Sequence, residues 1–138
     1  MRFHDVVLPA DGQTMPDRGD VRRILDFGMS LGAAGGASHL LVHCYAGVSR
    51  STAATAILMA QANPGREEEA FTALHDIRPR AWPNSHMVTL ADELLARRGR
   101  LRDALEAYYR VATRRYDGLA DYIRSIGGRE HEVPEETR

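Results

Sequence analysis

The chain has 138 residues, of which 43% are hydrophobic and 27% are charged, proportions typical of a single soluble globular domain. The formal net charge is −1, and no apolar stretch is long enough to cross a bilayer, so we expect neither nucleic acid nor a membrane as a partner. A single cysteine cannot form an internal disulfide, and the first residues lack the order of a signal peptide, so we expect a cytoplasmic protein.

The first third of the chain predicts two strands separated by a helix. Residues 2–8, RFHDVVL, indicate a short strand. Residues 17–31 place apolar side chains at helical spacing behind Asp17, which is a suitable cap, and the GAAGG run at 32–36 breaks this helix. Residues 38–43, SHLLVH, form a short apolar run between turn signals, which is typical of a buried strand.

The remainder of the chain predicts helices. An alanine-rich helix is expected over 51–61, a second over 66–77, a third from a cap at Asn84 or Ser85, and a C-terminal helical pair over 99–126. Residues 127–138 are a polar tail that we expect to fray. These elements predict one domain over 1–126, with its core at 3–95, followed in sequence by the helical pair at 99–126.

The cysteine lies in the stretch HCYAGVSRS, residues 43–51, between the second predicted strand and the alanine-rich helix. A tight loop that enters a helix turns its backbone N–H groups toward one point and binds anions there. Gly47 allows the loop to curl, and the guanidinium of Arg50 can hold two phosphate oxygens. Because such surroundings lower the pKa of a thiol, Cys44 is predicted to be a nucleophile aimed at phosphate.

The other residues of the loop are expected to support this chemistry. Ser51 could donate a hydrogen bond to the sulfur of Cys44, and His43 could fix the loop through its ring nitrogens. A lone cysteine is more often a small buried hydrophobe, but Gly47 and Arg50 at these positions favour the catalytic interpretation. The backbone amides expected to hold the phosphate belong to Tyr45, Ala46, Gly47, Val48, Ser49 and Arg50.

This stretch resembles the H-C-x-x-G-x-x-R-S signature of the cysteine-dependent protein tyrosine phosphatases. SHLLVHCYAGVSRSTAATAILMA is similar to their dual-specificity branch, and IRPRAWPNSHMVTLADELL looks like its R-P-x-x-x-P-N stretch, as in short bacterial tyrosine phosphatase-like proteins. The resemblance implies an α/β fold with a small central sheet flanked by helices. It also implies hydrolysis of phosphotyrosine, and by the same chemistry phosphoserine or phosphothreonine, through a phosphocysteine intermediate without a cofactor. The partner would be a phosphorylated protein or a small phosphomonoester.

The resemblance further implies an aspartate that protonates the leaving oxygen from a loop upstream of the cysteine. Asp11, in PADGQ, has the expected position between a strand and a helix. Asp5, within the predicted strand, and Asp17, the expected helix cap, are its rivals. A turn aspartate without a catalytic role is the simpler interpretation of Asp11, because Asp-Gly favours turns.

One departure from the family concerns the start of the chain. Family members usually have several strands and a helix before the acid loop, whereas few residues precede Asp11. We therefore expect the usual N-terminal strands to be missing. Either the C-terminal helices cover the gap, or an oligomer forms through an uncovered sheet edge, or the start is truncated. The alternative function is a weak or inactive module that binds phosphate without turnover.

Other readings of the sequence are less favoured. Rhodanese-like sulfurtransferases typically have a shorter loop, low-molecular-weight phosphatases carry theirs closer to the N-terminus, and phosphoinositide phosphatases often have lysines that YAGVS lacks. Arg78 and Arg80 could meet a second phosphate or acidic substrate residues, or simply form a solvated face. The histidines are not spaced as metal ligands, so we predict no metal site.

Overall fold

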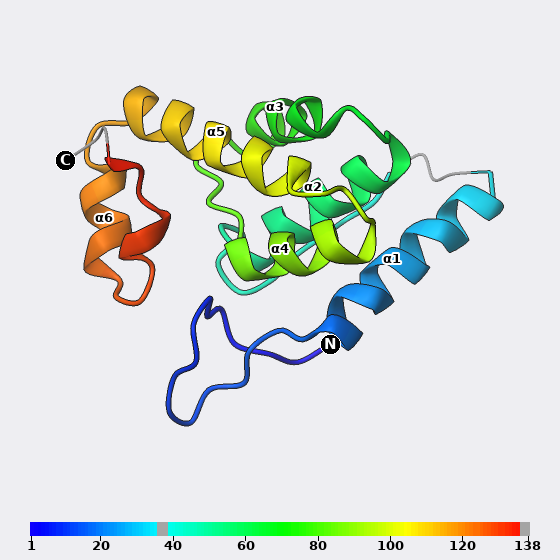
Figure 1. Cartoon of the computed structure of the whole chain (residues 1–138), viewed down its shortest axis with the longest axis horizontal. Helices are drawn as coiled ribbons and strands as arrows, with labels where there is room; N and C mark the ends of the chain where they lie inside the picture. The colour runs from blue at the N-terminus through cyan, green and yellow to red at the C-terminus, as the bar shows by residue number, and fades with distance from the viewer. Residues whose placement is uncertain (36–38, 136–138) are drawn as a thin grey trace.

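The computed structural model describes residues 1–35 and 39–135, and within these ranges its regular structure is entirely helical (Figure 1). No helix in the described ranges is both long enough and apolar enough to span a membrane. The elements are α1 (Arg18–Ala33), α2 (Arg50–Ala62), α3 (Glu67–Ile77), α4 (Ser85–Leu94), α5 (Arg100–Arg115), α6 (Leu119–Ser125) and a short 3-10 helix, η1 (Glu130–Glu132).

The predicted α/β fold with a central sheet is wrong, because none of the described residues lies in a strand. The predicted strand at 2–8 is irregular, as is the part of the predicted strand at 38–43 that falls within the described residues. Leu41, expected to be buried, is 85% exposed. Strands need a neighbouring strand for their backbone hydrogen bonds, and the N–H of His4 instead donates to the carbonyl of Thr14, 2.8 Å away. The described residues therefore contain no sheet edge through which the expected oligomer could form.

The predicted helices are confirmed, and two of them, α1 and α4, begin at the expected caps. Asp17 accepts a hydrogen bond from the N–H of Asp20 over 2.8 Å, while the side chain of Asp20 accepts one from the N–H of Asp17. This reciprocal capping box starts α1. Asn84 caps α4 by accepting from the N–H of Met87. The GAAGG run stops α1 at Ala33, and its last glycine lies outside the described residues.

Helix α2 forms the centre of the core and contacts α1, α3 and α4 (Figure 1). Its inner face carries alanines that let the neighbouring helices approach, with Ala53, Ala56 and Ile57 fully buried. Helix α5 lies across α3 and α4. Trp82, in the connection before α4, is also fully buried and stacks on Tyr109 of α5 with ring centroids 4.0 Å apart.

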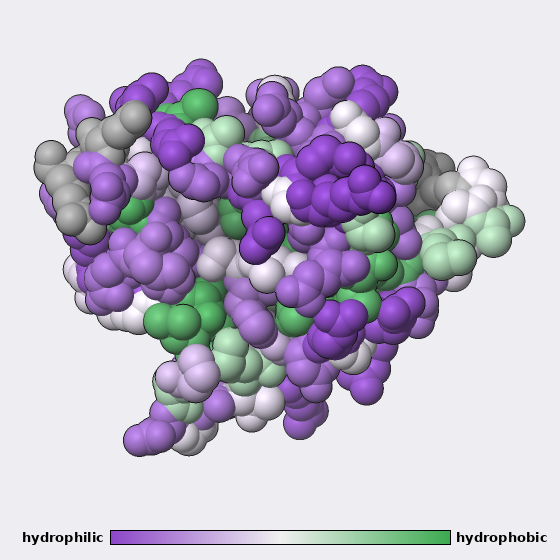
Figure 2. All heavy atoms as spheres, viewed as in Figure 1, coloured by the Kyte–Doolittle hydropathy of each residue, from purple (hydrophilic) through white to green (hydrophobic). Residues whose placement is uncertain are grey.

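The C-terminal tail does not fray as predicted over its described part. After α6 the chain folds back, and Arg129, Glu132 and Val133 are each at most 6% exposed. Residues 136–138 of the predicted tail lie outside the described residues. On the face seen in Figure 2, polar side chains cover most of the surface and apolar ones gather in small separate patches.

Candidate functional site

The loop at residues 43–49 leads directly into α2, so its curvature is set by the backbone of a few residues. Gly47 has a φ of +67°, in the left-handed region that glycine adopts without steric cost. A Cβ added there would have the guanidinium of Arg78 as its nearest neighbour, at 3.8 Å. The space beside Gly47 is therefore open, and the backbone conformation is what requires glycine.

The loop brings Cys44, Gly47 and Ser51 together. The N–H of Gly47 donates to the sulfur of Cys44 over 3.3 Å, and the hydroxyl of Ser51 lies 3.3 Å from the same sulfur. Partial burial raises the pKa of Cys44, but the hydrogen bonds of Ser51 and Gly47 and the charge of Arg50 outweigh burial and lower this pKa to about 7. A substantial fraction of Cys44 is therefore thiolate at neutral pH, which is the reactive form.

Arg50, the first residue of α2, lies close enough to Cys44 for its charge to act on the thiol. One of its terminal N–H groups donates to the carbonyl of Phe3 over 2.9 Å. Its Nε is buried and finds no partner among the described residues. Buried donors are nearly always satisfied in proteins, so an unsatisfied one beside a nucleophile requires an explanation. A bound anion would supply the missing acceptor.

Two cavities flank Cys44. The first, of about 180 Å³, is lined by Phe3, Arg50 and Met87 together with the thiol. The second, of about 390 Å³, is lined by the loop and by Leu74 and Arg78 from α3 and its end. Cys44, Ser51 and His43 line both cavities. Among the described residues, no aspartate or glutamate lines either one.

The other predicted loop residues differ in exposure. His43 and Ala46 are exposed, and Tyr45 is 97% exposed. Val48 is half-buried, and its carbonyl accepts a hydrogen bond from the N–H of Trp82 over 2.8 Å. Ser49 is buried. The loop therefore points one side toward solvent and rests its other side on the connection before α4.

The structure does not bring Asp11 to the thiol. Asp11 is exposed and lies in a turn closed by the N–H of Gln13 donating to the carbonyl of Ala10 over 3.1 Å. It lines neither cavity beside Cys44. Its rival Asp17 is used as the cap of α1. The proton donor of the predicted chemistry thus stays a prediction from sequence.

Asp5 has a structural role behind the loop. One carboxylate oxygen accepts hydrogen bonds from the hydroxyl of Ser49 at 2.6 Å and from the amide of Asn84 at 3.0 Å. The other oxygen lies 3.4 Å from the guanidinium of Arg129. A carboxylate engaged by three donors is committed to holding the loop, and Asp5 lines neither cavity.

Sequence reasoning missed Arg129 and Glu132, which complete this support. Arg129 donates to the hydroxyl of Ser49 at 2.8 Å and to the carboxylate of Glu132 at 2.7 Å. Glu132 also accepts from the indole N–H of Trp82 at 2.7 Å. Burial opposes the charge of Arg129, but Glu132 and Asp5 outweigh that cost and raise its pKa. The one available signal was the i,i+3 spacing of Arg129 and Glu132 in an otherwise polar tail.

No known protein family's model, no curated protein and no solved structure matches this chain significantly. Within the described ranges, no three histidine, cysteine or acidic side chains are grouped so as to hold a metal ion. The features of this chain that point to a function are therefore the geometry of the loop and the sequence signature within it.

Proposed function

We propose that this chain is a cysteine-dependent phosphatase that hydrolyses phosphotyrosine, and by the same chemistry phosphoserine or phosphothreonine, through a phosphocysteine intermediate. The observation that carries this proposal is the environment of Cys44. Its sulfur is in contact with the N–H of Gly47 and the hydroxyl of Ser51, and its pKa is lowered to about 7. Arg50 beside it has a buried N–H group in need of an acceptor.

In the proposed reaction, the thiolate of Cys44 attacks phosphorus in line with the leaving oxygen. The S–P bond forms as the P–O bond breaks, and the leaving oxygen takes up a proton. Arg50 and the loop N–H groups hold the equatorial oxygens, where the charge of the transition state is spread. Water then attacks phosphorus, orthophosphate is released, and Ser51 stabilises the departing thiolate of Cys44. No cofactor enters either step.

The proton for the leaving oxygen is assigned to Asp11 by the family resemblance. Asp11 belongs to the same N-terminal segment as Phe3, whose carbonyl accepts from Arg50. An aryl oxide with a strongly electron-withdrawing substituent can depart without a proton donor, so Cys44 and Arg50 suffice for such substrates. Natural phosphotyrosine, a poorer leaving group, requires the acid.

A second candidate function is capture of phosphate groups without turnover. Within the part of the chain that the structure describes, no carboxylate lines either cavity beside Cys44, and this observation favours capture. The two candidates differ in one observable, the release of product. They share the requirement for Arg50 and for the N–H groups of the loop.

The deciding experiment is hydrolysis of p-nitrophenyl phosphate by the purified chain beside Cys44→Ser and Arg50→Gln. Turnover that both substitutions abolish is the expected result. Vanadate binding without turnover in the intact chain would instead establish the binding module. Full turnover retained by Cys44→Ser would overturn the proposed phosphatase, because Cys44 would then not be the nucleophile.

A further inference from the structure

A third cavity adjoins the loop on the side of the C-terminal helices. It has a volume of about 480 Å³ and lies where the loop, the connection before α4 and the turn between α5 and α6 meet. We call it the arginine cleft. Its principal lining residues are Val48, Arg78, Arg80, Arg115, Tyr116 and Tyr122.

The arginine cleft has an excess of positive charge. Arg78, Arg80 and Arg115 are all exposed, and none of the three forms an ion pair within the described ranges. Asp117 is the one acidic residue in the lining that the described residues provide. Guanidinium groups without a carboxylate partner bind carboxylates and phosphates, often through two parallel hydrogen bonds.

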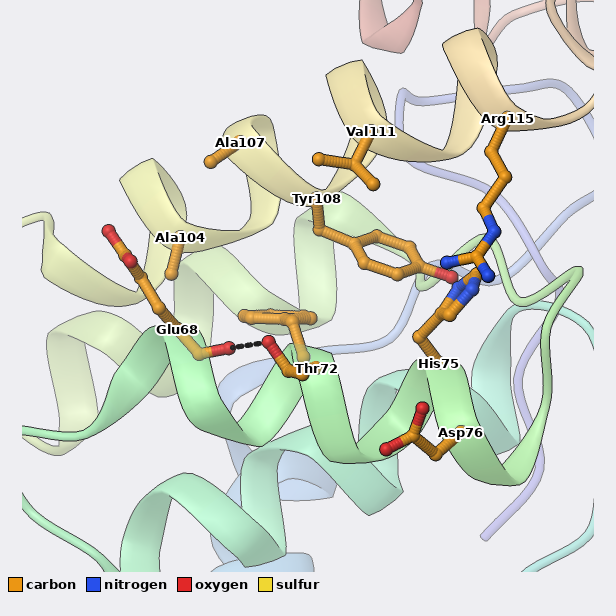
Figure 3. Close-up of a pocket in the computed structure, with 10 residues that line it drawn as sticks. Glu68, Thr72, His75, Asp76, Ala104, Ala107, Tyr108, Val111 and Arg115 are labelled. Carbon is orange, nitrogen blue, oxygen red and sulfur yellow. Dashed lines mark hydrogen bonds between the residues drawn. The ribbon is translucent and has the colours of Figure 1, made fainter.

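Aromatic side chains also line this cleft, beside the arginines that supply its charge. The guanidinium carbon of Arg80 lies 6.0 Å from the centroid of the Tyr116 ring, a separation at which the ring restrains the cation. Arg115 also borders a separate hollow between α3 and α5, where it reaches toward His75 (Figure 3). Apart from Arg115, that hollow shares no lining residue with the arginine cleft and includes none from the loop, so we assign no ligand to it.

Arg78 connects the arginine cleft with the site of Cys44. It lines both the cleft and the larger cavity beside the thiol. Its Nε donates to the carbonyl of Gly47 over 3.0 Å, and Val48, the next residue, lines the cleft. An anionic group in the cleft would therefore lie close to a phosphate held at the thiol, on the same substrate.

We propose that the arginine cleft is a second anion subsite and that the preferred substrate is a phosphopeptide with carboxylate or phosphate side chains next to the attacked residue. This inference rests on the proposed function, because it takes the phosphate at Cys44 as the first anchor. The shared chemistry is an anionic oxygen group on a peptide side chain. Tyr116, Tyr122 and Leu119 supply apolar contact for the carbon atoms that carry it.

The test measures binding to Cys44→Ser, so that turnover does not interfere. Three peptides of equal length each carry one phosphotyrosine, flanked on both sides by glutamate, by phosphoserine or by glutamine. Calorimetry at constant ionic strength gives the three dissociation constants. We expect both anionic peptides to bind at least about tenfold more tightly than the glutamine peptide, and the larger preference identifies carboxylate or phosphate as the better ligand.

Variants locate the preference on the molecule. In the Cys44→Ser background, Arg80→Gln with Arg115→Gln should reduce the preference to about twofold or less. Arg22→Gln in α1 removes the charge of an exposed arginine outside the cleft and should leave the preference at its original value. Equal binding of the three peptides, or an equal fall in preference with Arg22→Gln, would overturn the subsite.

Failure of this inference is distinguishable from failure of the proposed function. Hydrolysis of p-nitrophenyl phosphate, which has no flanking group, reports on Cys44 alone. Hydrolysis without a preference for anionic flanks overturns the arginine cleft and leaves the phosphatase. A preference located by Arg80 and Arg115 in a chain without hydrolysis supports the cleft and overturns the phosphatase.

Discussion

Arg129 donates a hydrogen bond of 2.8 Å to the hydroxyl of Ser49 and so ties the C-terminal tail to the loop that carries Cys44. The same guanidinium is paired with Glu132, and both residues are buried, at 5% and 6% exposure. Ser49 also donates to Asp5. The loop is thus held from behind by residues near both ends of the chain, and its conformation depends on how the whole chain folds.

Replacing Arg129 should destabilise the protein strongly. Arg129→Met leaves Glu132 buried without its counter-charge, a change that typically costs about 3–5 kcal/mol of unfolding free energy. The measurement is chemical denaturation followed by circular dichroism. Arg18→Met is the matched control, because it removes an exposed pair with Glu93 and should cost less than about 1 kcal/mol.

A double variant separates the effect of the unpaired charge on Glu132 from the effect of losing its contact with Arg129. Glu132→Gln keeps an acceptor for Trp82 but removes the negative charge, so Arg129→Met with Glu132→Gln should recover part of the lost stability. Alkylation of Cys44 in the same proteins reports whether the loop has changed. Stability within about 0.5 kcal/mol of the intact chain for Arg129→Met alone would show that the buried pair does not support the loop.

The pH dependence of Cys44 reactivity follows from its lowered pKa. Because the pKa is about 7, alkylation by iodoacetamide should rise with pH and reach half its maximal rate near pH 7. Ser51→Ala removes a hydrogen bond to the sulfur and should move the midpoint upward, slowing alkylation at pH 6 about tenfold. Ser125→Ala, which changes an exposed hydroxyl far along the chain, should leave the curve in place. Superimposable curves for Ser51→Ala and the intact chain would remove Ser51 from the site.

The sequence predicts the helices well because their signals are local. Apolar residues at helical spacing and the caps Asp17 and Asn84 are read within a few residues, and the structure has α1 and α4 starting immediately after them. The strand predicted at 38–43 rests on a short apolar run between turn signals. Such a run becomes a strand when a partner segment pairs with it, and pairing is a long-range property that composition does not contain.

In the candidate site, too, the residues close together in sequence could be predicted and the distant ones could not. Cys44, Gly47 and Ser51 are close in sequence, so a loop of the expected shape brings them together. Arg129 and Ser49 are eighty residues apart, and both are ordinary polar residues with no periodic pattern. Asp11 was placed by analogy with a family whose acid loop follows a sheet. Without that sheet in the described residues, Asp11 lies in the turn that the local Asp-Gly sequence favours and lines neither cavity beside Cys44.

Gly47 offers a test of the loop conformation itself. Gly47→Ala places a Cβ at a φ of +67° and should cost about 1–2 kcal/mol of unfolding free energy, since the space is open and the strain is in the backbone. The strain should also shift the N–H of Gly47 away from the sulfur and raise the pKa of Cys44. Gly12→Ala is a close control, because Gly12 has a φ of +70° in an exposed turn with no atom near its Cβ position. Gly12→Ala should lower the free energy of unfolding by a similar amount without changing the alkylation of Cys44. An equal change in alkylation would mean that overall destabilisation, and not the loop conformation, causes the effect of Gly47→Ala.

The roles of Asp11 and Asp5 can be separated by leaving-group dependence and stability. Asp11→Asn should slow hydrolysis of phenyl phosphate, whose leaving oxygen needs a proton, by about a hundredfold, and slow p-nitrophenyl phosphate much less. Its stability should be unchanged, because Asp11 is an exposed turn residue. Asp5→Asn should instead cost about 1–2 kcal/mol of unfolding free energy, since Ser49 and Arg129 lose part of their acceptor. It should affect both substrates equally through the loop. A leaving-group dependence that appears with Asp5→Asn and not with Asp11→Asn would assign the acid to Asp5.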